Sequence, residues 1–76
     1  MRLTSEQIQG VLELVPSAQV NRLHGPNPYI RIRYWDRINK TQLNELNIGL
    51  AKLGLKVDEI EDWDDDSGPL FWYSLK

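Results

Sequence analysis

Residues 29–35 read Tyr-Ile-Arg-Ile-Arg-Tyr-Trp, in which aromatic and arginine side chains alternate with apolar ones. A β-strand with this period of two sends alternate side chains to opposite faces of a sheet. The apolar set of Ile30, Ile32 and Tyr34 is expected to face the core. The opposite set, joined by a ring from a later strand, is predicted to form an open surface: Tyr29, Arg31, Arg33, Trp35 and Trp72.

Aromatic rings interleaved with arginines can do three different things on an open sheet. They can stabilise the sheet itself, with rings pairing across strands and arginines pairing with Glu59 or Glu61. They can bind a protein, because Tyr, Trp and Arg are enriched at interface hot spots. They can also stack on unpaired bases and bind phosphate, although the net charge of −2 is unlike that of most nucleic-acid binders.

We therefore predict a small non-catalytic interaction module that binds a protein partner, or a second copy of itself, through the aromatic and arginine face. Single-stranded nucleic-acid binding through the same face is the alternative. The two hypotheses differ in their electrostatics, because nucleic-acid binding should weaken strongly as salt is added.

The second candidate for chemistry is the acidic segment 62–68, Asp-Trp-Asp-Asp-Asp-Ser-Gly. Asp62, Asp64 and Asp66 have the alternate spacing that a calcium loop uses. The glycine comes one position late for an EF-hand, and Tyr73 stands where the twelfth-position glutamate would be. We expect a solvated turn with no metal site, and we expect its acidic side chains to steer a basic partner: Asp64, Asp65 and Asp66.

Catalytic signatures are weak in this sequence. His24 is the single histidine and sits beside the turn sequence Gly25-Pro26, with no carboxylate at local spacing. The serines lie in no nucleophile motif, and no phosphate-binding glycine loop is present. We predict that the protein is not an enzyme and uses no cofactor.

Size and composition restrict the remaining choices. The chain has 76 residues and no cysteine, which excludes disulfides and cysteine-based zinc sites and leaves self-association as a source of extra stability. No apolar run is long enough to span a membrane, and we expect a soluble, cytoplasmic protein. Residues 1–40 carry a formal charge of +3 and residues 41–76 carry −5. Such asymmetry indicates either an interaction surface or two halves that neutralise each other within one sheet, and we favour the second.

The elements that must position these side chains begin with two similar segments. Leu3-Thr4-Ser5-Glu6-Gln7-Ile8 and Ile38-Asn39-Lys40-Thr41-Gln42-Leu43 each place a capping residue three positions before a glutamine. Each pattern predicts a capping box with a hydrophobic staple around it.

Apolar periodicity predicts helices over 5–14 and 40–53 and strands over 18–23, 29–35, 56–63 and 70–75. On the first helix, Leu12 belongs to the predicted apolar face. Gly54 fits a left-handed helix C-cap, whereas Gly49 either permits a close approach of another backbone or is simply tolerated. The third strand has an irregular pattern, which predicts a bulge or an edge position. Residues 25–28 and 64–69 are predicted turns.

Two matching helix starts, each followed by two strands, suggest internal αββ repeats over 3–35 and 38–75 within a single domain over 1–76. The predicted fold is an α+β two-layer sandwich of order αββαββ. Its four-stranded, mainly antiparallel sheet carries both helices on one face.

Overall fold

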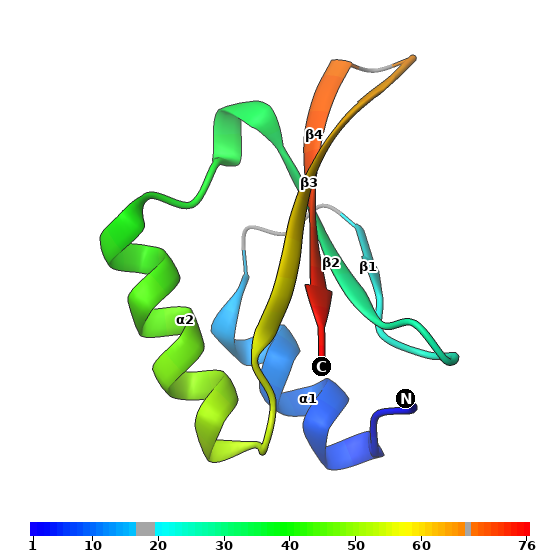
Figure 1. Ribbon diagram of the computed structural model, residues 1–76, viewed down its shortest axis with the longest axis vertical. Helices are drawn as coiled ribbons and strands as arrows, with labels where there is room; N and C mark the ends of the chain where they lie inside the picture. The colour runs from blue at the N-terminus through cyan, green and yellow to red at the C-terminus, as the bar shows by residue number, and fades with distance from the viewer. Residues whose placement is uncertain (17–19, 67) are drawn as a thin grey trace.

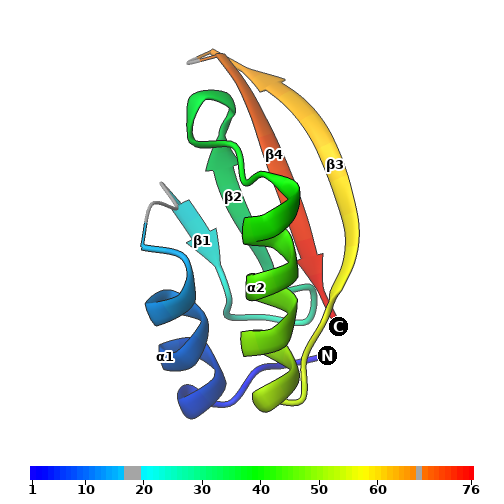
Figure 2. The ribbon, with the colours of Figure 1, turned by 90° about the vertical axis from the view of Figure 1, so that its left-hand side faces the viewer.

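The computed structural model describes residues 1–16, 20–66 and 68–76. Its elements are α1 (Ser5–Leu14), β1 (Val20–Arg22), β2 (Tyr29–Arg33), the 3₁₀ helix η1 (Tyr34–Asp36), α2 (Lys40–Lys52), β3 (Val57–Asp65) and β4 (Gly68–Leu75). The predicted α+β class is confirmed, with both helices lying on one side of the sheet (Figures 1 and 2). The two halves differ in strand length, since β1 has three residues and β3 has nine; their duplication stays a prediction.

Both helix starts form the predicted capping boxes. In α1 the backbone N–H of Gln7 donates to Thr4 Oγ1 at 3.2 Å, and the Gln7 side chain accepts from the Thr4 N–H at 2.9 Å. In α2 the corresponding bonds join Asn39 and Gln42 at 2.8 and 2.9 Å. These bonds satisfy N–H groups that a helix start leaves without partners. Gln7 Nε2 also donates to the carbonyl of Leu53 at 2.9 Å, which ties the start of α1 to the end of α2.

The end of α2 has the predicted glycine cap. Gly54 has a φ of 77°, in the left-handed region that glycine adopts without a steric cost. The N–H of Leu55 then donates back to the carbonyl of Leu50 at 2.8 Å. This geometry ends the helix and sends the chain into β3.

The four strands pair antiparallel in the order β1-β2-β4-β3, so β2 and β4 are central and β1 and β3 lie at the edges. The register of β3 against β4 shifts between Val57 and Ile60. This confirms the predicted irregularity of the third strand. Beyond the helices, β3 and β4 continue as a two-stranded hairpin (Figure 1).

The core lies between the helices and the inner face of the sheet. Ile30 and Ile32 on β2 are fully buried, and Tyr73 opposite Ile30 is buried with them. Their helical partners in the core cluster include Val11, Leu46 and Leu50. The period-two alternation of β2 therefore sorts its side chains as predicted up to Arg33, with the apolar ones inward.

The strand predicted over 29–35 is too long. It ends at Arg33, and Tyr34 and Trp35 belong to η1, where the N–H of Arg37 donates to the Tyr34 carbonyl at 3.1 Å. Tyr34 is 53% exposed and not a core residue. The physical reason is the path of the chain, which leaves the sheet after Arg33 to reach the helix layer and start α2.

Other boundaries also differ from the predictions. The turn predicted over 64–69 is shorter, because β3 continues to Asp65 and β4 begins at Gly68. β1 covers only Val20–Arg22, and positions 18 and 19 of the predicted strand lie outside the described residues. Leu12, predicted on the apolar face of α1, is exposed and lies outside the core cluster.

Candidate functional site

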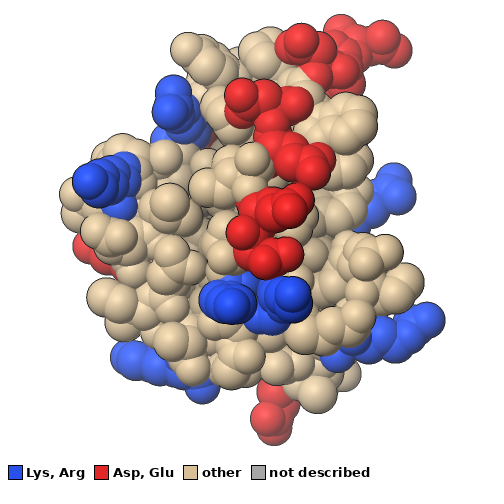
Figure 3. Space-filling model, in the orientation of Figure 1, with Lys and Arg blue, Asp and Glu red and all other residues tan. Residues whose placement is uncertain are grey.

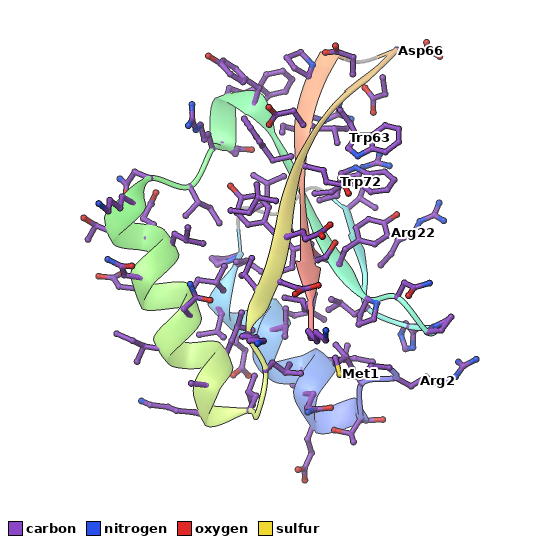
Figure 4. All side chains as sticks on the ribbon, in the orientation of Figure 1. Met1, Arg2, Arg22, Trp63, Asp66 and Trp72 are labelled. Atoms are coloured by element: carbon purple, nitrogen blue, oxygen red, sulfur yellow. The ribbon has the colours of Figure 1, made fainter. Side chains whose placement is uncertain are left out.

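The candidate site is the side of the sheet that faces away from the helices, which we call the outer face. On β2 and β4, the residues of the outer face alternate with the core residues. On β3, the outer-face residues are the ones that pair with outer-face residues of β4. Figure 4 shows Trp63, Trp72 and Arg22 directed to this side. The outer face used below consists of Tyr29, Arg31, Arg33, Glu61, Trp63, Asp65, Leu70 and Trp72.

Three aromatic rings form a continuous stack across the outer face. Tyr29 and Trp72 stack with centroids 4.5 Å apart and planes 11° apart, and Trp72 and Trp63 stack at 4.7 Å and 22°. Since these residues come from β2, β4 and β3, the Trp72 ring lies between its two neighbours. Stacked aromatic pairs contribute about 0.5–1.5 kcal/mol beyond their buried area.

The indole N–H groups of the two tryptophans have different surroundings. Trp63 Nε1 donates to Glu61 Oε2 at 3.0 Å, which orients this ring on the surface. Trp72 Nε1 is buried, with no acceptor among the residues that the structure describes. Trp72 is therefore held in place by ring packing and not by a hydrogen bond.

Both arginines of the outer face form ion pairs with Asp65. Asp65 lies 3.5 Å from Arg33 and 3.9 Å from Arg31, measured between guanidinium nitrogens and carboxylate oxygens. The sequence suggested Glu59 or Glu61 as the structural partners, but within the described part of the chain these arginines form ion pairs with Asp65. The twist of the β3–β4 hairpin brings Asp65 over the β2 arginines, because sheets twist by about 20–25° per strand.

Trp35 was predicted on the sheet face, but it lies beside the sheet in η1. It is 65% exposed, with the Arg33 guanidinium 5.9 Å from its ring centroid. A side-chain carbon at Gly68 would lie 4.0 Å from the Trp35 ring, so this indole approaches the start of β4. Tyr29, Arg31, Arg33 and Trp72 are thus assembled on one surface, with Trp35 at its margin.

The three predicted steering carboxylates have three different positions. Asp65 forms ion pairs with the two arginines of the outer face. Asp64 pairs with Pro69 and lies on the opposite face of β3 from Asp65. Asp66 lies at the tip of the hairpin (Figure 4). They extend a line of acidic side chains that follows β3 (Figure 3). Six of the nine β3 residues are acidic and none is basic: Asp58, Glu59, Glu61, Asp62, Asp64 and Asp65.

A pocket of about 450 Å³ adjoins the aromatic stack. Tyr29 and Trp72 line one part of it, with the carboxylates of Asp58 and Glu61 and the side chain of Lys76 nearby. The pocket therefore combines two aromatic rings with acidic and basic residues.

The member of the outer face that sequence reasoning missed is Trp63. Its registration against Leu70 puts it on the face of Trp72, where it completes the ring stack. The signal was the closure of the hairpin, because the pairing of Asp65 with Gly68 sets Trp63 opposite Leu70. The irregular start of β3 obscured that phase, and the turn was predicted to be longer.

The features with catalytic potential do not converge. His24 is exposed in the β1–β2 connection. Across residues 1–16, 20–66 and 68–76, no three His, Asp or Glu side chains come together as a metal-binding group. Neither helix of the described chain has the length and apolar character needed to cross a bilayer.

Comparison with known proteins gave no match. No protein-family model matches the chain, and no curated protein or solved structure matches it. The residues and geometry of the outer face are therefore the basis for the proposal that follows.

Proposed function

We propose that the protein is a small non-catalytic interaction module that binds a protein partner through the outer face. The observation that carries the proposal is the Tyr29–Trp72–Trp63 stack, flanked by the exposed indole of Trp35. Tyr and Trp offer large contact areas, and a stack ordered before binding loses little conformational freedom when a partner docks.

Exposure supports a binding role for the two outermost indoles. Trp63 is 47% exposed although one ring face is stacked on Trp72, and Trp35 is 65% exposed. Burying this surface against a partner would release water from apolar area, at about 25 cal/mol per Å². The Arg31 and Arg33 pairs with Asp65 give the same surface a polar border that orients a partner.

Electrostatics favour a protein over a nucleic acid as the partner. Arg31 and Arg33 lie next to Asp65, and β3 borders the outer face with six acidic side chains. A phosphate backbone would be repelled by these carboxylates. Nucleic-acid binding is therefore an outcome that the experiment must be able to detect.

The experiment compares the wild-type protein with the double variant Trp35→Ala, Trp63→Ala. The control is Leu12→Ala, Ile48→Ala, which removes two exposed apolar side chains from the helices. Thermal melts verify that all three proteins are folded. Each is then used for affinity capture from the source cells, for light-scattering determination of solution mass, and for titration with a short single-stranded oligonucleotide.

We expect the tryptophan variant to lose a partner, either another protein or a second copy, that the wild type and the control retain. Equal capture and equal solution mass for all three proteins would overturn the proposal. Quenching of tryptophan fluorescence by the oligonucleotide, lost in the variant, would instead assign the face to nucleic acid.

A further inference from the structure

β3 offers an open backbone edge beside the outer face. In the part of the chain that the structure describes, β3 pairs with β4 alone, and its residues from Asp58 to Asp65 are all exposed. The opposite edge, β1, has only three residues. An exposed edge presents unpaired N–H and C=O groups at alternate residues, which another extended chain can pair with.

The usable part of this edge is the regular stretch from Ile60 to Asp65. The register shift before Ile60 bends the strand and interrupts its ladder, so a partner could not continue through it. The remaining six residues match the common length of a β-strand. The hairpin projects beyond the helix layer (Figure 2), and both faces of this stretch are exposed.

Charge determines which chain can occupy the edge. Four of the six residues from Ile60 to Asp65 are carboxylates: Glu61, Asp62, Asp64 and Asp65. A second copy paired edge to edge along β3 would place carboxylates opposite carboxylates, and like charges directly opposite each other destabilise a sheet. A strand rich in lysine and arginine would place opposite charges in the same positions.

The side chains specify the occupant further. On the outer face, a basic residue opposite Trp63 would lie against the exposed part of the indole, with Glu61 next to it. On the other face, Asp62 and Asp64 would pair with the alternate residues of the added strand. Basic residues are thus favoured on both faces of the added strand, with an apolar one opposite the exposed Ile60.

From the open backbone edge of β3 and the acidic side chains along it, we infer that the stretch from Ile60 to Asp65 pairs with an extended lysine- and arginine-rich segment of a protein partner. This segment would add a fifth strand to the sheet. The inference rests on the proposed protein-binding function and names the partner's chemistry. The carboxylates select the partner, and the hydrogen-bonding edge holds it.

The test uses a synthetic peptide of about eight residues made of Lys, Arg and Val. A second peptide has the same sequence with alternate backbone amides N-methylated, which removes donors needed for strand pairing. A third has Glu in place of the basic residues. Binding is followed by ¹H–¹⁵N NMR spectra and amide hydrogen exchange of the full chain.

We expect the basic peptide to bind and to slow exchange at alternate amides between Ile60 and Asp65. N-methylation should weaken binding by about tenfold or more, because several backbone hydrogen bonds to the β3 edge are lost. Equal binding of the N-methylated peptide would show attraction by charge alone and overturn the inference. So would the absence of binding at low salt, or equal binding of the Glu peptide.

Two double variants test the role of the carboxylates. Asp62→Asn, Asp64→Asn should weaken binding of the basic peptide by about fivefold, because two exposed ion pairs with the peptide are lost. Glu13→Gln, Glu45→Gln makes the same change of charge on the helices and should change binding by less than about twofold. Equal losses in both variants would contradict a specific edge site.

The two proposals fail in different experiments. If Trp35 and Trp63 are needed for partner capture but the basic peptide does not bind, the outer face retains its function and the edge inference falls. If the peptide pairs with the edge while the tryptophan variant captures the same partners, the outer-face proposal falls.

Discussion

The indole rings of Trp63 and Trp72 stack across the β3–β4 hairpin with their centroids 4.7 Å apart. Tyr29 stacks on Trp72 from the β2 side at 4.5 Å, so the rings join three strands on the side of the sheet opposite the core. The stack therefore has a structural role in the central sheet and, at its exposed end, provides the surface of the proposed binding face.

Coupling between these two indoles should be visible in the far-ultraviolet circular dichroism spectrum. Stacked indoles couple electronically and give a pair of bands of opposite sign. Trp63→Phe and Trp72→Phe should each abolish the pair, whereas Trp35→Phe should leave it, because among the described residues Trp35 lies against the Arg33 guanidinium and stacks on no other indole. Retention of the bands in either of the first two variants would contradict the stack.

The Asp65 ion pairs should stabilise the fold modestly. Asp65→Asn should lower the free energy of unfolding by about 0.5–1 kcal/mol at low salt, since both arginine pairs are partly exposed. The loss should shrink in high salt, where surface charges are screened. Urea unfolding at two salt concentrations measures the effect, with Asp66→Asn at the hairpin tip as the matched control. An equal loss in both variants would show a general effect of charge.

The helices contact each other through Gly49 and Leu14. A side-chain carbon built on Gly49 would lie 2.5 and 2.9 Å from the two methyl carbons of Leu14. Gly49→Ala should therefore fail to give the gain of about 1 kcal/mol expected from helix propensity, because Leu14 must move. In a Leu14→Ala background the same change should be stabilising.

Thermal or urea unfolding of the four proteins in this cycle gives the interaction between the two sites. A coupling of about 0.5 kcal/mol or more would confirm the contact. Additive effects within measurement error would mean that Leu14 adjusts without cost.

Tyr73 should make stability fall at alkaline pH. Burial raises the pKa of its hydroxyl above the ordinary value of 10.0, with a backbone hydrogen bond from Ile38 and the charge of Arg37 acting in the opposite direction. The unfolded chain therefore ionises first. The contribution of Tyr73 is fully present below pH 10 and is lost as the pH rises through the native pKa.

Unfolding measured from neutral pH to above pH 10 should show this loss in the wild type and a smaller one in Tyr73→Phe. Tyr29→Phe is the control, because it removes a hydroxyl from the outer face. Parallel pH profiles for wild type and Tyr73→Phe would assign the alkaline loss to other groups.

Local pattern was sufficient to predict the helices and their starts. Each capping box is made within four consecutive residues, and its hydrogen bonds depend on nothing distant. Likewise, the alternation of Ile30 and Ile32 with Arg31 and Arg33 follows from the period of an extended chain. The α+β class follows from the order of such elements.

Register and twist, in contrast, decided the composition of the candidate site. Trp63 reaches the stack only because the register of β3 on β4 pairs it with Leu70, and Asp65 reaches the arginines across β4 because the sheet twists. Trp35 leaves the sheet because the chain must return to the helix layer.

By itself the sequence determined the two helices and the core of each strand, since caps and periodicity act between residues a few positions apart, but it did not determine where β2 and β3 end. The tertiary structure alone decided which aromatic and charged side chains meet, because those contacts join β2, β4 and β3 over long separations. A shift of one residue in the β3–β4 register would move Trp63 to the face of the sheet that carries the core, and its stacking on Trp72 would be lost.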